Sequence, residues 1–293
     1  DDFLKAATRN TAKLWIDKPA IPYTVSLLYN SDQRNKIACA IQEFNENFCM
    51  KFVPRRYESN YVHISPIGGC FSAIGKQGGR QEISLVDGCF KFGIIIHELM
   101  HTIGFYHEQS RTDRDRYIEI LWDNVVRGDE VQFQKYSTNK IDHLGLPYDY
   151  DSVMHYGAHA FTRNGKPTIR QKYPGPRIGQ RRGFSLLDLQ RINVLYRCPG
   201  IVVDHNCKDA NTERCVSLAP LCARSTSVKR YCKATCGQCG TRPDDESGNS
   251  EERSRRRKCR DRSRDCGEFA DNGFCDNSFV KRQCPISCVS NEC

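Results

Sequence analysis

The sequence predicts an α+β domain followed by two small disulfide-rich modules. In residues 20–104, β-rich runs alternate with helical patterns, as expected for a sheet covered by helices. Residues 108–150 are more polar and contain few strand signals. Twelve of the 17 cysteines follow residue 206, in two clusters with related spacing. The chain therefore divides into one domain of ordinary size and a stapled tail.

The first half of the domain contains the clearest elements. Residues 21–29 are β-rich and form the first expected strand, with Pro22 near its start, where a missing N–H donor is tolerated. Apolar residues then recur at helical spacing, which predicts an amphipathic helix over residues 32–48 that packs on a sheet. Glycine-rich turns separate the further strands expected at residues 50–53, 61–65 and 81–86.

Two more helices are expected in the second half. Residues 122–136 form one helical pattern in an otherwise polar stretch. Ser185 and Asp188 resemble a capping box, which predicts a helix that continues through Tyr196.

Composition indicates a disulfide-bonded protein of an oxidising compartment, and we expect it to be secreted and extracellular. The 293 residues are 39% hydrophobic, which fits a globular core. No apolar run approaches the ~20 residues of a membrane-spanning helix. The net charge of +9 comes largely from residues 253–264. We interpret this segment as a solvated basic linker, because no motif of a nucleic-acid-binding fold accompanies it.

The tail is an internal repeat of about 35 residues, and units of this size need covalent staples to hold a fold. The expected modules are residues 207–239 and 259–293. Residues 240–258 are charged and nearly without apolar side chains, so we expect them to form a flexible linker.

One run carries the chemistry, from His97 to His107. On a helix, His97 and His101 lie one turn apart on the same face, so both imidazoles can bind one metal ion. Glu98 stands beside the first ligand, where it can take a proton from a metal-bound water. Gly104 lets the chain leave the helix and return His107 as a third ligand. Three nitrogen ligands leave a position open for water, as in catalytic zinc sites.

These residues closely resemble the astacin family of metzincin zinc endopeptidases. The resemblance covers about residues 6–198, and the tail modules resemble ShKT domains through their cysteine spacing. The residues that carry the likeness to astacins are the run His97–Glu108, Arg111, Asp113, Arg114, Asp115, Ser152–Tyr156, Trp15, Ile21–Tyr23, Gly69–Cys70 and Gly88–Cys89.

The resemblance implies a two-subdomain architecture for residues 10–199, with a twisted sheet and helices above the active-site cleft and an irregular half below. Cys39, on the amphipathic helix, is then left over as a buried apolar filler or as the partner of a removed propeptide or another chain. The disulfides implied are Cys49–Cys198 and Cys70–Cys89 in the domain, Cys207–Cys239, Cys215–Cys232 and Cys222–Cys236 in the first module, and Cys259–Cys293, Cys266–Cys284 and Cys275–Cys288 in the second.

The resemblance also implies roles for the site residues. His97, His101 and His107 hold one Zn²⁺ per chain, Glu98 is the general base and then the acid, and Tyr156 stabilises the oxyanion and ligates zinc in the resting state only. Met154 forms an apolar floor beneath the histidines.

The sequence leaves two alternatives for the amino terminus of the active enzyme. In the family, the Glu at position 108 meets the new amino terminus of an activated zymogen. Alignment on Trp15 puts that terminus near Ala6, and cleavage at Arg9-Asn10 is another candidate. Residues 1–9 are therefore expected to be either a propeptide remnant or part of the mature N-terminal segment. Arg181 or Arg182 is expected near the pocket for the substrate residue after the cleaved bond.

The sequence thus predicts a secreted zinc endopeptidase that hydrolyses internal peptide bonds of extracellular proteins. The alternative is a channel- or matrix-binding protein whose ShKT tail carries the main activity. The ShKT toxin's key Lys-Tyr pair is absent, because those positions hold Ser227-Val228 and Val280-Lys281. Docking of the tail to substrate or extracellular matrix is therefore expected rather than channel block.

Overall fold

The computed structural model describes residues 7–16, 20–137 and 139–199, and in the tail 209–210, 215, 218, 222 and 225–236. The expectations for residues 1–6, the linker and the second module lie outside these residues. So do four of the implied disulfides, namely Cys207–Cys239, Cys259–Cys293, Cys266–Cys284 and Cys275–Cys288.

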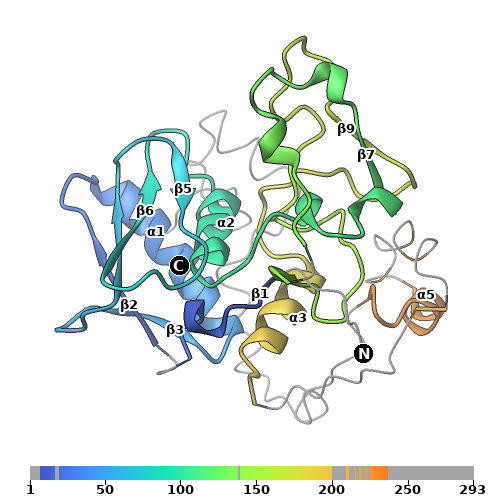
Figure 1. Ribbon diagram of the computed structural model, residues 1–293. Coiled ribbons are helices and arrows are strands. Elements are labelled where there is room, and N and C mark those ends of the chain that lie inside the picture. Colours follow the sequence, from blue (N-terminus) through green and yellow to red (C-terminus); the bar gives the residue numbers. More distant parts are fainter. Residues whose placement is uncertain are drawn as a thin grey trace, which may run out of the picture.

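A five-stranded sheet forms the first half of the domain, in the order β3-β2-β4-β6-β5 (Figure 1). Neighbouring strands are parallel except for β5, which runs antiparallel to β6 at the sheet edge. The expected strands are present, although the first one ends earlier than residue 29, and β5 was not expected. The strands are β2 (Ala20–Val25), β3 (Lys51–Pro54), β4 (Tyr61–Ser65), β5 (Cys70–Ser72) and β6 (Arg80–Leu85).

Two helices pack against one face of this sheet. The helix expected over residues 32–48 is α1 (Ser31–Asn47), and α2 (Phe92–Thr102) carries the histidine motif. The Phe44 ring of α1 lies 4.9 Å from the Phe52 ring of the sheet, centroid to centroid. The resulting core joins both helices to alternate sheet residues, and its fully buried members include Ile21, Val62, Ile64, Ile83, Ile96 and Leu99. The motif helix is therefore held on a rigid base.

The second half of the domain is irregular. The prediction of a helix over residues 122–136 is wrong. Two short 3₁₀ turns, Trp122–Asn124 and Glu130–Phe133, stand in its place. Gly128 separates them with a φ of +95°, a conformation that no α-helix continues through. The remaining short elements are β1 (Ala7–Thr8) paired with β8 (Ile141–Asp142), β7 (Ile118–Ile120) paired with β9 (Ile169–Gln171), and the 3₁₀ turns Thr11–Lys13, Glu108–Ser110 and Arg114–Arg116.

The helix expected after Ser185 is α3 (Leu186–Leu195), and the capping box between Ser185 and Asp188 is formed. A disulfide between Cys49 and Cys198 ties the end of α3 to the end of α1. A second disulfide, Cys70–Cys89, links β5 to the segment before α2. These are the two domain disulfides that the family resemblance implies. Cys39 is buried on α1.

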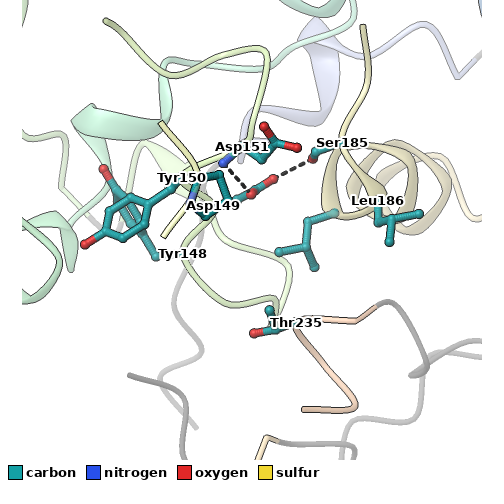
Figure 2. A pocket seen from close by; sticks show the side chains of 9 residues that line it. Tyr148, Asp149, Tyr150, Asp151, Ser185, Leu186 and Thr235 are labelled. Atoms are coloured by element: carbon teal, nitrogen blue, oxygen red, sulfur yellow. Dashed lines mark hydrogen bonds between the residues drawn. The ribbon is translucent and has the colours of Figure 1, made fainter. Parts of the chain in front are cut away.

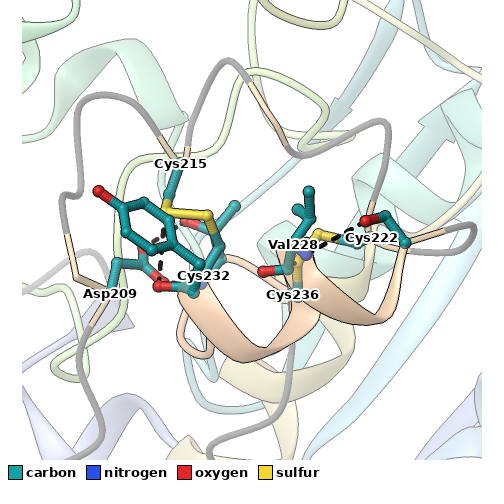
Figure 3. Close-up of a disulfide and its surroundings, with 9 residues drawn as sticks. Asp209, Cys215, Cys222, Val228, Cys232 and Cys236 are labelled. Atoms are coloured by element: carbon teal, nitrogen blue, oxygen red, sulfur yellow. Dashed lines mark hydrogen bonds between the residues drawn. A yellow bond between two sulfur atoms is a disulfide. The ribbon is translucent and has the colours of Figure 1, made fainter.

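The described part of the first module is a small helix held by disulfides. Cys215–Cys232 and Cys222–Cys236 flank α5 (Thr226–Tyr231), as Figure 3 shows. The Asp209 carboxylate accepts hydrogen bonds from the backbone N–H and the hydroxyl of Thr235, at 3.0 and 2.5 Å. Among the residues that the structure describes, no helix is long and apolar enough to cross a membrane.

Candidate active site

Three imidazole rings converge at the C-terminal end of α2. The Nε2 atom of His107 lies 3.2 Å from that of His97 and 3.1 Å from that of His101. His97 and His101 come from successive turns of α2, as their spacing predicts. Within the described residues these three form a group whose ligand atoms all lie within 4.8 Å of one another.

The hydrogen bonds of the rings indicate what lies between them. The Nδ1 atoms of His97 and His101 lie 2.8 and 2.7 Å from the carbonyl oxygens of Val153 and Phe105. A carbonyl can only accept, so each Nδ1 carries the proton and each Nε2 presents a lone pair. The Nε2 lone pairs of His97 and His101 therefore both face the Nε2 atom of His107, and three imidazole nitrogens that converge in this way fit a divalent metal ion such as zinc.

The protonation of the histidines agrees with metal binding. Desolvation by burial lowers the pKa of His97 and of His107, and it lowers the pKa of His101 to about 4. The three rings are therefore neutral at pH 7, which is the form that binds a metal.

Gly104 makes the third histidine available. Its φ is +104°, and a Cβ at this position would lie 2.9 Å from Cγ2 of Thr8. Both facts favour glycine, because other residues avoid this conformation and the space is filled. The backbone then turns, with the Gly104 N–H donating to the carbonyl of His101, and carries His107 back to the helix.

Glu98 is a buried carboxyl group beside the histidines. Burial raises its pKa to about 8, against the opposing effect of the Arg181 charge. Its Oε2 atom has no hydrogen-bond partner among the described residues. A buried carboxyl oxygen without a partner is costly, so its presence here favours a chemical role over a structural one.

The segment Ser152–Tyr156, here called the Met turn, lies on the other side of the histidines. Met154 is buried, and its carbonyl accepts a hydrogen bond from the backbone N–H of Glu108. The Tyr156 ring lies 4.4 Å from the His107 ring, centroid to centroid. Burial raises the pKa of Tyr156 to about 12, so its hydroxyl keeps its proton and can donate it in a hydrogen bond.

Sequence reasoning missed Gln109, which holds this tyrosine. Its side-chain oxygen accepts a hydrogen bond of 3.0 Å from the backbone N–H of Tyr156. The position next to the motif was the available signal, but nothing in the sequence relates residue 109 to residue 156.

Glu108 is buried in a polar cluster away from the converging nitrogens. Its Oε1 atom accepts from the backbone N–H of Asp149 at 2.8 Å, from Arg191 at 2.9 Å and from Arg111 at 3.3 Å. The expected contact with an amino terminus involves residues outside the described part of the chain. The first described residue, Ala7, is buried and bridges to Phe105.

The two arginines predicted near the substrate lie in different surroundings. Arg181 is partly buried, and its guanidinium donates a hydrogen bond of 3.0 Å to the carbonyl of His155. Its positive charge lowers the pKa of both Glu98 and Tyr156, against the larger effect of burial. Its own carbonyl accepts from the N–H of Gly93 at the start of α2. Arg182 is exposed and pairs with Asp151 at 3.1 Å. Of the two residues, Arg181 is the one whose charge reaches Glu98 and Tyr156.

A small pocket lies beside the start of α3, and the histidines are not among its lining residues (Figure 2). Asp149 and Ser185 meet there through a hydrogen bond of 2.5 Å, and Thr235 of the first module completes the wall. The three histidines and this pocket are therefore separate places on the protein.

Comparisons with known proteins agree with this geometry. The model of the Astacin family (Peptidase family M12A) matches residues 7–197, and the ShK domain-like model matches residues 206–239 and 258–289.

Among curated relatives, zinc metalloproteinases nas-13 and nas-15 of Caenorhabditis elegans are 44% and 41% identical over 97% and 96% of this chain. The chain spans 64% and 48% of their lengths. A solved structure, the hatching enzyme zinc-protease high choriolytic enzyme 1 of Oryzias latipes, is 40% identical with a TM-score of 0.59. The match covers 67% of this chain and 95% of that one. Since the family model spans well over half of the sequence, the chain belongs to the astacin family of zinc metallopeptidases.

Proposed function

We propose that the chain is a secreted zinc-dependent endopeptidase that hydrolyses internal peptide bonds of extracellular proteins. The observation that carries this proposal is the convergence of three histidine Nε2 atoms next to Glu98, whose Oε2 atom has no hydrogen-bond partner among the described residues. His97, His101 and His107 would hold one Zn²⁺ per chain. The disulfides of the domain and of the first module support an oxidising, extracellular setting.

When bound, zinc polarises the scissile carbonyl and lowers the pKa of water from 15.7 to about 7. Glu98 accepts a proton from the attacking water and then delivers it to the leaving amine, acting as base and then as acid. Burial shifts the pKa of Glu98 upward from that of an ordinary carboxyl group, which is the direction that suits a group returning a proton to the leaving amine. The Tyr156 hydroxyl donates a hydrogen bond to the oxyanion that forms on the scissile carbonyl.

Strand β5 supports an extended peptide as the substrate. It is the last strand of its sheet, and its Phe71 is 45% exposed. The Ser72 hydroxyl lies 2.8 Å from the Thr102 hydroxyl at the end of α2, which ties this edge to the motif helix. A substrate paired to the edge by backbone hydrogen bonds would continue past the histidines on both sides, as an endopeptidase requires.

The role of Glu98 is tested with Glu98→Gln. We expect this variant to retain zinc and to cleave peptides about 10²–10⁴-fold more slowly, because the amide cannot take a proton. Cleavage of casein and zinc content by metal analysis are the two measurements. Casein hydrolysis at the wild-type rate would refute the assignment.

The role of Tyr156 is tested with Tyr156→Phe. The loss of one oxyanion donor should lower kcat by about 10²–10³ and leave KM nearly unchanged. Steady-state kinetics on one peptide separate the two constants. A rise in KM with an unaltered kcat would show that Tyr156 serves binding instead.

Arg181 is proposed to favour an acidic substrate residue after the cleaved bond, because it places a positive charge beside the site. A cleavage profile on a peptide library should show acidic residues enriched there. Arg181→Gln should lose this enrichment, and the matched change at the exposed Arg182 should keep it. A wild-type profile without acidic enrichment would remove the idea.

For the tail we propose docking to substrate or extracellular matrix, supported by the two ShK domain-like matches. A chain that ends at residue 200 retains the Cys49–Cys198 disulfide. It should cleave short peptides at the full rate and macromolecular substrates more slowly. Equal rates for both chains on matrix proteins would argue against docking.

A further inference from the structure

The outer hydrogen bonds of two histidines in the site differ in their origin. The Nδ1 of His101 bonds the carbonyl of Phe105, four residues away in the turn that follows the same helix. The Nδ1 of His97 bonds the carbonyl of Val153, 56 residues away in the Met turn. The orientation and tautomer of His97 therefore depend on a segment that α2 itself does not fix.

Asp188 of α3 holds that segment. Its Oδ2 atom accepts from the backbone N–H of Val153 at 2.9 Å, and its Oδ1 atom accepts from the Ser152 hydroxyl at 2.7 Å. The same hydroxyl accepts from the N–H of Met154 at 3.1 Å. The peptide groups on both sides of Val153 are thus anchored, which aims its carbonyl at His97.

Asp188 is itself held in place. It is fully buried, and Ser185 completes a capping box with it: the Asp188 N–H donates to the Ser185 hydroxyl at 2.9 Å, and the Ser185 N–H donates to Oδ2 at 3.1 Å. The Cys49–Cys198 disulfide ties down the far end of α3. Asp188 therefore does more than a helix cap needs, because it also accepts two hydrogen bonds from the Met turn.

We propose that Asp188 is a positioning residue of the zinc centre, acting on His97 through Val153. The inference rests on the proposed ligand set of His97, His101 and His107. Loss of an outer-shell partner lowers metal affinity by about 10–100-fold. In Asp188→Asn the amide NH₂ replaces one acceptor oxygen, so one of the two donors from the Met turn loses its partner.

The test measures the zinc Kd of the full chain by chelator competition, together with the melting temperature. Asp188→Asn should weaken zinc binding by about tenfold or more. The matched control is Ser185→Ala, which removes the cap hydroxyl of α3 but not the Asp188–Val153 bond. This control should lower the melting temperature and keep the Kd of the wild type. A lower melting temperature with an unchanged Kd in Asp188→Asn would overturn the inference.

Two further variants make the result decisive. If Asp188→Asn does not fold, Ser152→Ala replaces it, since it removes one of the two anchors; a wild-type Kd would then overturn the inference. His97→Ala tests the ligand set separately. A wild-type Kd in His97→Ala would refute the ligands themselves, whereas a weak Kd there with a wild-type Kd in the Asp188 variant would refute only the role of Asp188.

Discussion

Three converging imidazole Nε2 atoms set the constraint on which the rest of the site depends: that of His107 lies 3.2 Å from that of His97 and 3.1 Å from that of His101. The protein must hold three polar ring nitrogens together in a largely buried place, where a bound cation would satisfy them. It does so with a buried helix, a turn that requires glycine at position 104, and carbonyl groups that fix the protons on Nδ1. The metal then stabilises the folded state, because the unfolded chain has no such site.

This constraint joins the two halves of the domain. His97 and His101 belong to the helix on the sheet, whereas Val153, Met154 and Tyr156 belong to the irregular half. The bond between His97 and Val153 crosses that division next to the converging nitrogens. The Cys49–Cys198 disulfide crosses between α1 and α3 further away. The site is therefore held by long-range contacts, although the motif that reveals it is local.

That difference explains what the sequence could predict. Periodicity and capping signals are local, so α1, α3 and most strands of the sheet were found close to their positions. The pattern over residues 122–136 failed because Gly128 and tertiary packing outweighed weak helical periodicity. Arg181 and Arg182 are neighbours in sequence, and only the fold brings one of them to the site. Asp188 was recognised as half of a capping box, but its bond to Val153 crosses 35 residues and leaves no local pattern.

Glu98 shows why such a site needs a well-anchored frame. A buried polar atom without a hydrogen bond costs about 1–3 kcal/mol, a sizeable part of a domain's net stability of about 5–15 kcal/mol. A loose frame would relax until the carboxyl found a partner or met water, and its pKa would return toward the ordinary value. The core around α2, the Met turn and the α3 cap prevent that relaxation. Holding the Oε2 atom of Glu98 without a hydrogen-bond partner is thus a property of the whole domain and not of α2 alone.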